Sequence, residues 1–118
     1  MKKTVLMLAL AAGGLATPLL QAAQLFPLSA VRLGDGPFLD AQTTDLQYLM
    51  SFDPDKLLAP FRREAGLPQP KPSYGNWEAT GLDGHMGGHY LSALALMFAS
   101  TGDAQVRERL DYVLAELK

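Results

Sequence analysis

The residues best suited to chemistry gather in one glycine-rich stretch of the sequence. His85 and His89, the only histidines, stand four positions apart, so a helix would place both imidazoles on one face. Trp77, Glu78 and Asp83 come just before them and add an aromatic ring and two carboxylates. Imidazole and carboxylate groups form hydrogen bonds with hydroxyls, and an aromatic ring packs against a sugar face. We therefore expect these five residues to contact a carbohydrate.

Other roles for the same side chains stay open at this stage. A histidine pair at this spacing also binds zinc, but Met86 stands where the H-E-x-x-H motif has its glutamate. The histidines could also be structural, with His85 in a first helical turn and His89 packed against the loop. Glu78 and Asp83 could form a glycosidase carboxylate pair, although helix capping also explains Asp83. We assign no metal ligand and no catalytic residue here.

The stretch leads into an apolar segment, Tyr90 to Ala99, that is rich in Ala, Leu and Met and lacks β-branched residues. This composition predicts a helix buried on all sides, and the run is too short for a membrane span, which needs about 20 residues. We expect Asp83 to cap its start and Gly102 to end it. Three glycines strip side chains from the helix start, where a ligand could approach the backbone: Gly84, Gly87 and Gly88.

The chain of 118 residues opens with the features of a secretory signal. Lys2 and Lys3 precede an apolar run, Val5 to Leu15, and we expect cleavage after Ala22 or Ala23. Residues 1–22 are thus a predicted signal peptide, which implies a secreted or periplasmic protein with no membrane segment after cleavage. The net charge of −2 and the absence of a basic run argue against a nucleic-acid partner.

The segment after the signal predicts a mixture of extended chain and helix. Residues 24–36 look extended, and residues 38–52 carry an apolar stripe typical of a helix. Asp53 is a good N-cap for a short helical turn over residues 55–59, which we expect Pro60 to end. The four prolines within residues 60–73 predict an extended surface segment.

A further helix follows Asp103, its expected N-cap, and Arg107 and Asp111 can pair across one turn of it. An apolar inner helix followed by an amphipathic outer helix is the repeating unit of α/α toroids. The chain ends at Lys118 without a capping residue, and the inner helix has too few partners to be covered. We therefore expect the opening of a larger helical protein, poorly stable in isolation. The outer helix carries its apolar stripe at Val106, Leu110, Val113, Leu114 and Leu117.

These residues carry a resemblance to a known family. The run GNWEATGLDGHMGGHYLSALALMFASTGD is similar to the start of the catalytic domain of glycoside hydrolase family 127, the β-L-arabinofuranosidase type. The upstream DPDKLLAPFRREAGL and the downstream RERLDYVLAEL resemble the same family. The similarity covers about Phe26 to Lys118, and the G-H-x-x-G-H-Y-L-S-A core is fairly specific.

The resemblance implies an (α/α)6 barrel followed by β-sandwich domains, with retaining hydrolysis of L-arabinofuranosides. The family uses a Cys nucleophile, a Glu acid/base and a zinc ion held by Cys and Glu, all farther along its chain. This sequence has no Cys, so none of these residues can be carried over. What the resemblance implies for this stretch is a lining of the sugar cleft, chiefly by His85 and His89.

We therefore predict an all-α fold, the N-terminal helices of a truncated (α/α)6 barrel over residues 23–118. The predicted function is that of a secreted glycoside hydrolase fragment, inactive alone. Its partners would be the carbohydrate substrate and the rest of the catalytic domain. We expect no cofactor in this chain and zinc in the full-length family member. The alternative is a small secreted helical module that holds a ligand or partner through its Gly/His loop.

Overall fold

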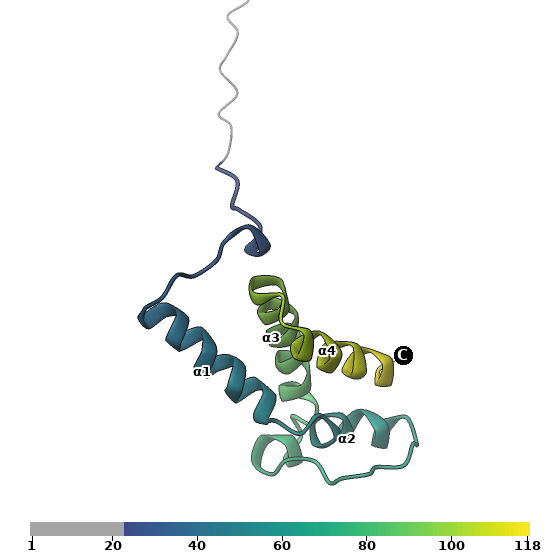
Figure 1. Cartoon of the computed structure of the whole chain (residues 1–118). Helices are drawn as coiled ribbons and strands as arrows, with labels where there is room; N and C mark the ends of the chain where they lie inside the picture. The colour runs from purple at the N-terminus through teal and green to yellow at the C-terminus, as the bar shows by residue number, and fades with distance from the viewer. Residues whose placement is uncertain (1–22) are drawn as a thin grey trace, which may run out of the picture.

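The computed structural model describes residues 23–118, and the predicted signal peptide lies outside these residues. Every regular element between residues 23 and 118 is helical: four α-helices and two short 3-10 helices. Figure 1 shows α3 and α4 side by side, with α1 set at an angle to them and α2 near the start of α3. The all-α prediction is confirmed.

The first helix, α1 (Pro37–Ser51), lies within one residue of its predicted bounds. Its start is set by Gly36, whose φ of 141° favours glycine, and by a proline in the first turn. The lead-in is irregular except for the 3-10 turn η1 (Leu28–Ala30), which packs against α3. The Arg32 guanidinium donates a 2.7 Å hydrogen bond to the Ser100 carbonyl, so the lead-in is held at the far end of α3.

The second helix, α2 (Pro54–Glu64), starts as predicted but does not stop at Pro60. The Asp53 carboxylate accepts a 3.0 Å hydrogen bond from the Asp55 N–H, which is the expected cap. The predicted end at Pro60 is wrong, because the helix continues for another four residues. The extended segment therefore begins only after the helix ends.

Tertiary contacts explain why α2 continues past its proline. Pro60 lacks the N–H that would bond one turn back, which costs about 3 kcal/mol in a helix interior. On the same helix Leu57 and Leu58 are buried in the core, and beyond the proline Arg62 is 7% exposed and bonded to α4. The Arg62 contacts exist only if the helix continues past Pro60, and they offset the missing hydrogen bond.

The hairpin of α3 (His85–Thr101) and α4 (Ala104–Glu116) matches the prediction closely. Gly102 ends α3 in the left-handed conformation, with a φ of 72° and its N–H bonded to the Phe98 carbonyl. The Asp103 carboxylate then accepts hydrogen bonds of 2.8 and 3.0 Å from the first N–H groups of α4. The predicted ion pair between Arg107 and Asp111 is present at 2.7 Å.

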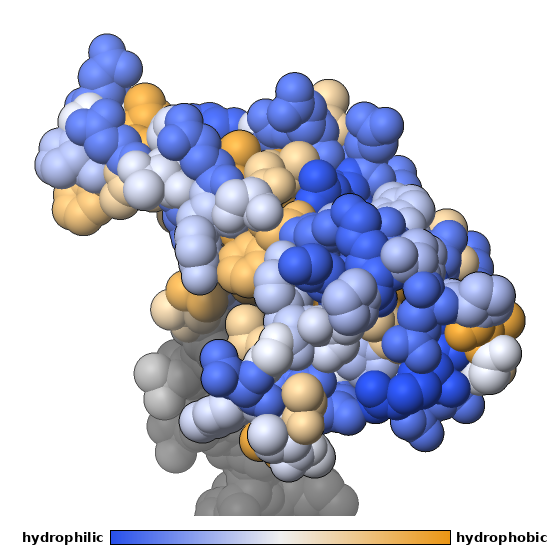
Figure 2. Space-filling view, turned by 90° about the horizontal axis from the view of Figure 1, so that it is seen from below, coloured by the Kyte–Doolittle hydropathy of each residue, from blue (hydrophilic) through white to orange (hydrophobic). Residues whose placement is uncertain are grey.

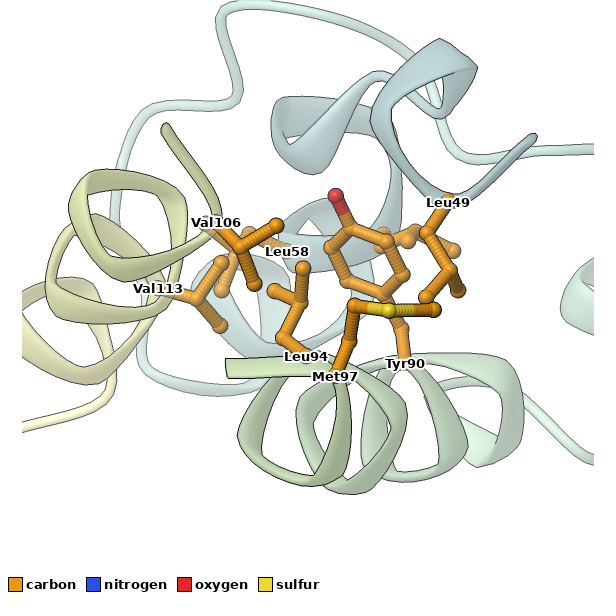
Figure 3. Close-up of a cluster of buried hydrophobic side chains, with 8 residues drawn as sticks. Leu49, Leu58, Tyr90, Leu94, Met97, Val106 and Val113 are labelled. Carbon is orange, nitrogen blue, oxygen red and sulfur yellow. The ribbon is translucent and has the colours of Figure 1, made fainter. Parts of the chain in front are cut away.

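The core lies between α3, α4, α2 and the end of α1 (Figure 3). Leu94 of α3 and Val106 of α4 meet at its centre, and both are 0% exposed. The opposite side of α3 is open, since Leu96 is 59% exposed. This confirms that residues 23–118 do not cover the apolar helix on all sides. The buried cluster consists of Leu49, Leu57, Leu58, Tyr90, Leu94, Met97, Val106 and Val113.

Apolar side chains reach the surface in several places, and Figure 2 shows hydrophobic atoms lying open between hydrophilic regions on one face. A hollow of about 680 Å³ lies between α1, α3 and η1, and we call it the α1–α3 trough. None of the helices within residues 23–118 is long and apolar enough to cross a membrane. The trough is lined by Leu28, Ala41, Gln42, Asp45, Leu49, Ala93, Leu96, Met97 and Ser100.

Candidate functional site

A pocket of about 340 Å³ opens at the start of α3, near the residues that we predict to contact a carbohydrate. Three of the five predicted residues line it, namely Trp77, Glu78 and His85, and Tyr74 joins them. Its size is within the range of about 300–1,000 Å³ typical of ligand pockets. We call it the Trp–His pocket; its other lining residues are Phe52, Leu57, Gly75, Asn76 and Met86.

One wall of the pocket is the 3-10 turn η2 (Asn76–Ala79), which carries Trp77. Asn76 takes a left-handed backbone conformation with a φ of 59°, which asparagine tolerates better than most residues. The Ser73 hydroxyl donates a 2.9 Å hydrogen bond to the Glu78 carbonyl and so ties the turn to the chain before it. The Trp77 side chain stays 66% exposed, free for a ligand to pack against.

The buried carboxylate of Glu78 caps α3, in place of the predicted Asp83. One oxygen accepts a 2.9 Å hydrogen bond from the Gly84 N–H, and the other accepts a 2.7 Å bond from the Met86 N–H. Glu78 is only 3% exposed, and a negative charge at a helix N-terminus is favourable. The prediction that Asp83 caps the helix is wrong, because Gly84 takes the N-cap position and Asp83 faces another partner.

Asp83 belongs to a different part of the surface. Its carboxylate accepts a 2.7 Å hydrogen bond from Arg63 of α2, and this pairing raises the pKa of Arg63 above its usual value. Both residues line a separate hollow of about 510 Å³ that also contains Phe61 and Gly81. Asp83 and Glu78 are thus each held by other groups, and neither is a free carboxylate poised for acid–base catalysis.

His85 and His89 share one face of α3, as their spacing predicts. Their ring centroids are 4.5 Å apart and the ring planes meet at 84°, an edge-to-face arrangement. His89 lines a smaller adjoining hollow of about 140 Å³, which shares Phe52, Leu57 and Met86 with the Trp–His pocket. Both imidazoles are exposed, and a neutral imidazole can both donate and accept a hydrogen bond.

The three glycines at the start of α3 differ in what surrounds them. A Cβ on Gly87 would lie 2.8 Å from the Phe61 ring, and one on Gly84 would lie 3.0 Å from it. The space that these glycines leave is therefore filled by Phe61 of α2, not kept open for a ligand as predicted. Only Gly88 has nothing within 4 Å of its Cβ position. Two of the three glycines are there for helix packing.

Sequence reasoning missed the polar network that joins α2 to α4. The Arg62 guanidinium pairs with Asp55 at 2.9 Å and with Glu116 at 2.6 Å. The Tyr112 hydroxyl donates to Asp55 at 2.6 Å, and this bond, together with Arg62, holds the pKa of Asp55 below its ordinary range. Asp55 and Arg62 are seven positions apart, two helical turns, but the expected end at Pro60 hid this spacing.

The fold and pocket define an all-helical protein with an aromatic and imidazole-lined pocket at the start of its inner helix. The model of the family described as "Beta-L-arabinofuranosidase, GH127 catalytic domain" matches residues 30–118. The chain therefore belongs to this family of glycoside hydrolase-related proteins. No curated protein matches the chain.

Proposed function

We propose that this chain forms the first helices of a secreted glycoside hydrolase that acts on L-arabinofuranosides, and that the Trp–His pocket is part of its sugar cleft. The family match over residues 30–118 carries the proposal. The signal-like residues 1–22 support export to the periplasm or the medium.

The pocket chemistry suits sugar binding. Trp77 and Tyr74 offer aromatic faces for the apolar C–H side of a sugar ring. His85 and His89 donate and accept hydrogen bonds with its hydroxyls. Glu78 and Asp83 act indirectly, because their carboxylates already bond to the first N–H groups of α3 and to Arg63, respectively. The chain thus binds and orients the sugar, and we propose that it has no hydrolytic activity alone.

The zinc that the family resemblance implies does not fit this chain. The sequence contains no Cys, and residues 23–118 hold no group of three or more His, Asp or Glu side chains arranged around one metal position. We propose that the acid/base, the nucleophile and the zinc ligands come from the rest of the catalytic domain, which is this chain's partner. The α1–α3 trough offers that partner an apolar surface.

Complementation tests the proposal. The mature chain is mixed with a GH127 catalytic domain that lacks its own corresponding helices, and release of nitrophenol from p-nitrophenyl β-L-arabinofuranoside is followed. We expect activity only in the mixture. Activity in neither component nor the mixture, despite a stable complex, would contradict the L-arabinofuranoside assignment.

His85→Ala and His89→Ala in the mixture test the pocket. Losing one hydrogen bond to an uncharged hydroxyl should cost about 0.5–1.5 kcal/mol of transition-state binding per variant. The matched control is Glu108→Gln on α4, an exposed residue that does not line the pocket. Unchanged kinetics in both histidine variants would make these residues structural, and loss of zinc in either would show a metal role.

A second candidate function is a small secreted helical binding module. One observation favours it: the whole Trp–His pocket is built from residues 52–86 of this chain. Titration of the mature chain alone with methyl β-L-arabinofuranoside, followed by the fluorescence of its single tryptophan, separates the two. Tight binding without the partner favours the module, and binding only in the mixture favours the hydrolase.

A further inference from the structure

Glu78 joins the two walls of the Trp–His pocket. Its backbone belongs to η2, which carries Trp77, and its carboxylate bonds to the Gly84 and Met86 N–H groups on either side of His85. Glu78 is among the lining residues of the pocket, but at 3% exposure it offers a sugar little access. A sugar in the pocket would touch Trp77 and His85, and the Glu78 carboxylate connects the turn that carries Trp77 to the helix that carries His85.

Two independent contacts show that this connection is specific. The Ser73 hydroxyl donates to the Glu78 carbonyl at 2.9 Å and holds the turn from its other side. Both Glu78 oxygens are used, so a group with one acceptor oxygen cannot replace them. Bonds from N–H groups to an ionised carboxylate are shorter and stronger than neutral ones, which suits a fixed distance between two walls.

We infer that Glu78 is a positioning residue whose two carboxylate oxygens lock the Trp77 turn to the first turn of α3 and so fix the gap in which the sugar is held. This inference rests on the proposed function for its ligand, but the lock itself is a property of the free chain. It gives Glu78 a role in binding without contact with the substrate.

The test replaces Glu78 with Gln, which keeps the shape but turns one acceptor oxygen into an NH2 donor facing a backbone N–H. Three readouts follow: the emission and acrylamide quenching of Trp77 and the imidazole C–H proton signals of His85 and His89 in the mature chain, and the affinity for methyl β-L-arabinofuranoside in the complementation mixture. We expect shifted Trp77 emission, shifted His85 signals and about tenfold weaker sugar binding, since a small misplacement of binding groups is costly. Glu108→Gln makes the same chemical change at an exposed position of α4 and should change none of these.

A merely structural role would look different. If Glu78→Gln lowers the melting temperature while the tryptophan and imidazole signals stay as in the wild type below the transition, the positioning role is overturned. If this variant does not fold, Glu78→Asp decides, because it keeps the negative charge and both acceptor oxygens but shortens the reach from the turn to the Gly84 and Met86 N–H groups by one methylene. Displaced Trp77 emission in that variant supports the lock, and unchanged emission overturns it.

Failure of the inference and failure of the proposed function give different patterns. A wild-type chain that binds no arabinofuranoside, alone or in the complementation mixture, removes the proposed ligand but leaves the tryptophan and histidine signals as a full test of the lock. Normal sugar binding with unmoved signals in Glu78→Gln removes the lock and leaves the proposed function standing.

Discussion

The two flanks of α3 are closed to very different degrees. On one flank α4 and α2 cover the helix, Leu94 and Val106 are fully buried, and Arg62 joins α2 to α4. On the other flank α1 packs against α3 through Leu49 near its end, but the α1–α3 trough beside it measures about 680 Å³, and Leu96 is 59% exposed. The covered flank has its partners in this chain, whereas the open flank leaves apolar side chains exposed, which we propose the rest of the catalytic domain covers.

The largest expected effect comes from truncating a side chain on the covered flank. Leu94→Ala should lower the free energy of unfolding by about 3–4 kcal/mol, because it leaves a cavity in the core. Leu96→Ala, two positions along the same helix, should change it by less than about 0.5 kcal/mol. Urea unfolding followed by circular dichroism measures both. Equal losses in the two variants would mean that the flanks do not differ.

The next effect tests the polar connection between α2 and α4. Arg62→Met leaves Asp55 and Glu116 without their cation. We expect a loss of about 2–3 kcal/mol, below the roughly 3–5 kcal/mol typical of a fully buried pair, because both carboxylates keep partial exposure. The measurement is again urea unfolding, with Arg107→Met on the exposed face of α4 as control. A change as small as that of the control would show that apolar contacts alone close this flank.

A smaller effect is expected where α2 crosses the start of α3. Gly87→Ala places a methyl group 2.8 Å from Phe61 and should destabilise the chain by about 1–2 kcal/mol, even though alanine favours helix. Gly88→Ala meets no atom within 4 Å and should stabilise it by about 0.5–1 kcal/mol. Thermal melts of the two variants give the signs. Stabilisation by both would show that Phe61 yields easily.

The smallest expected effect is on how the stability of the chain depends on pH in the acid range. The Tyr112 hydroxyl and Arg62 lower the pKa of Asp55 in the folded chain. The unfolded state therefore takes up the proton first as the pH falls below about 4, and the stability from this group, complete above that value, is lost as the pH falls through the folded pKa. Urea midpoints between pH 6 and pH 2.5 should fall less steeply in Asp55→Asn than in the wild type. Parallel curves would contradict the assignment.

The sequence predicts the helix ends that depend on neighbouring residues. Gly102 and Asp103 end one helix and begin the next, and Asp53 caps α2, because each of these residues bonds N–H or C=O groups a few positions away. The end of α2 was missed, since the energy that carries the helix through Pro60 comes from α4, some fifty positions later. Rules based on neighbouring residues therefore predict helix caps well, but they cannot predict contacts with distant residues that offset a proline inside a helix.

In the candidate site too, features set by neighbouring residues could be predicted, whereas those set by distant residues could not. Helical periodicity is enough to place His85 and His89 together, and their rings lie 4.5 Å apart. The separation of Asp83 from Glu78 could not be predicted, because it depends on the left-handed turn at Asn76 and on the position of Arg63. Nothing in the sequence near Gly84 and Gly87 indicates that Phe61 of α2 fills the space beside them, so the sequence alone suggests a space for a ligand there.

The contact between Arg32 and Ser100 has a consequence for the order of folding. It joins residues 68 positions apart, whereas α3 and α4 are joined by a two-residue connection. Closing the longer loop costs more chain entropy, so we expect the hairpin to form early and η1 to dock late. The amides of η1 should therefore exchange with solvent hydrogen far faster than those of α3, and the last contact made is the first one lost.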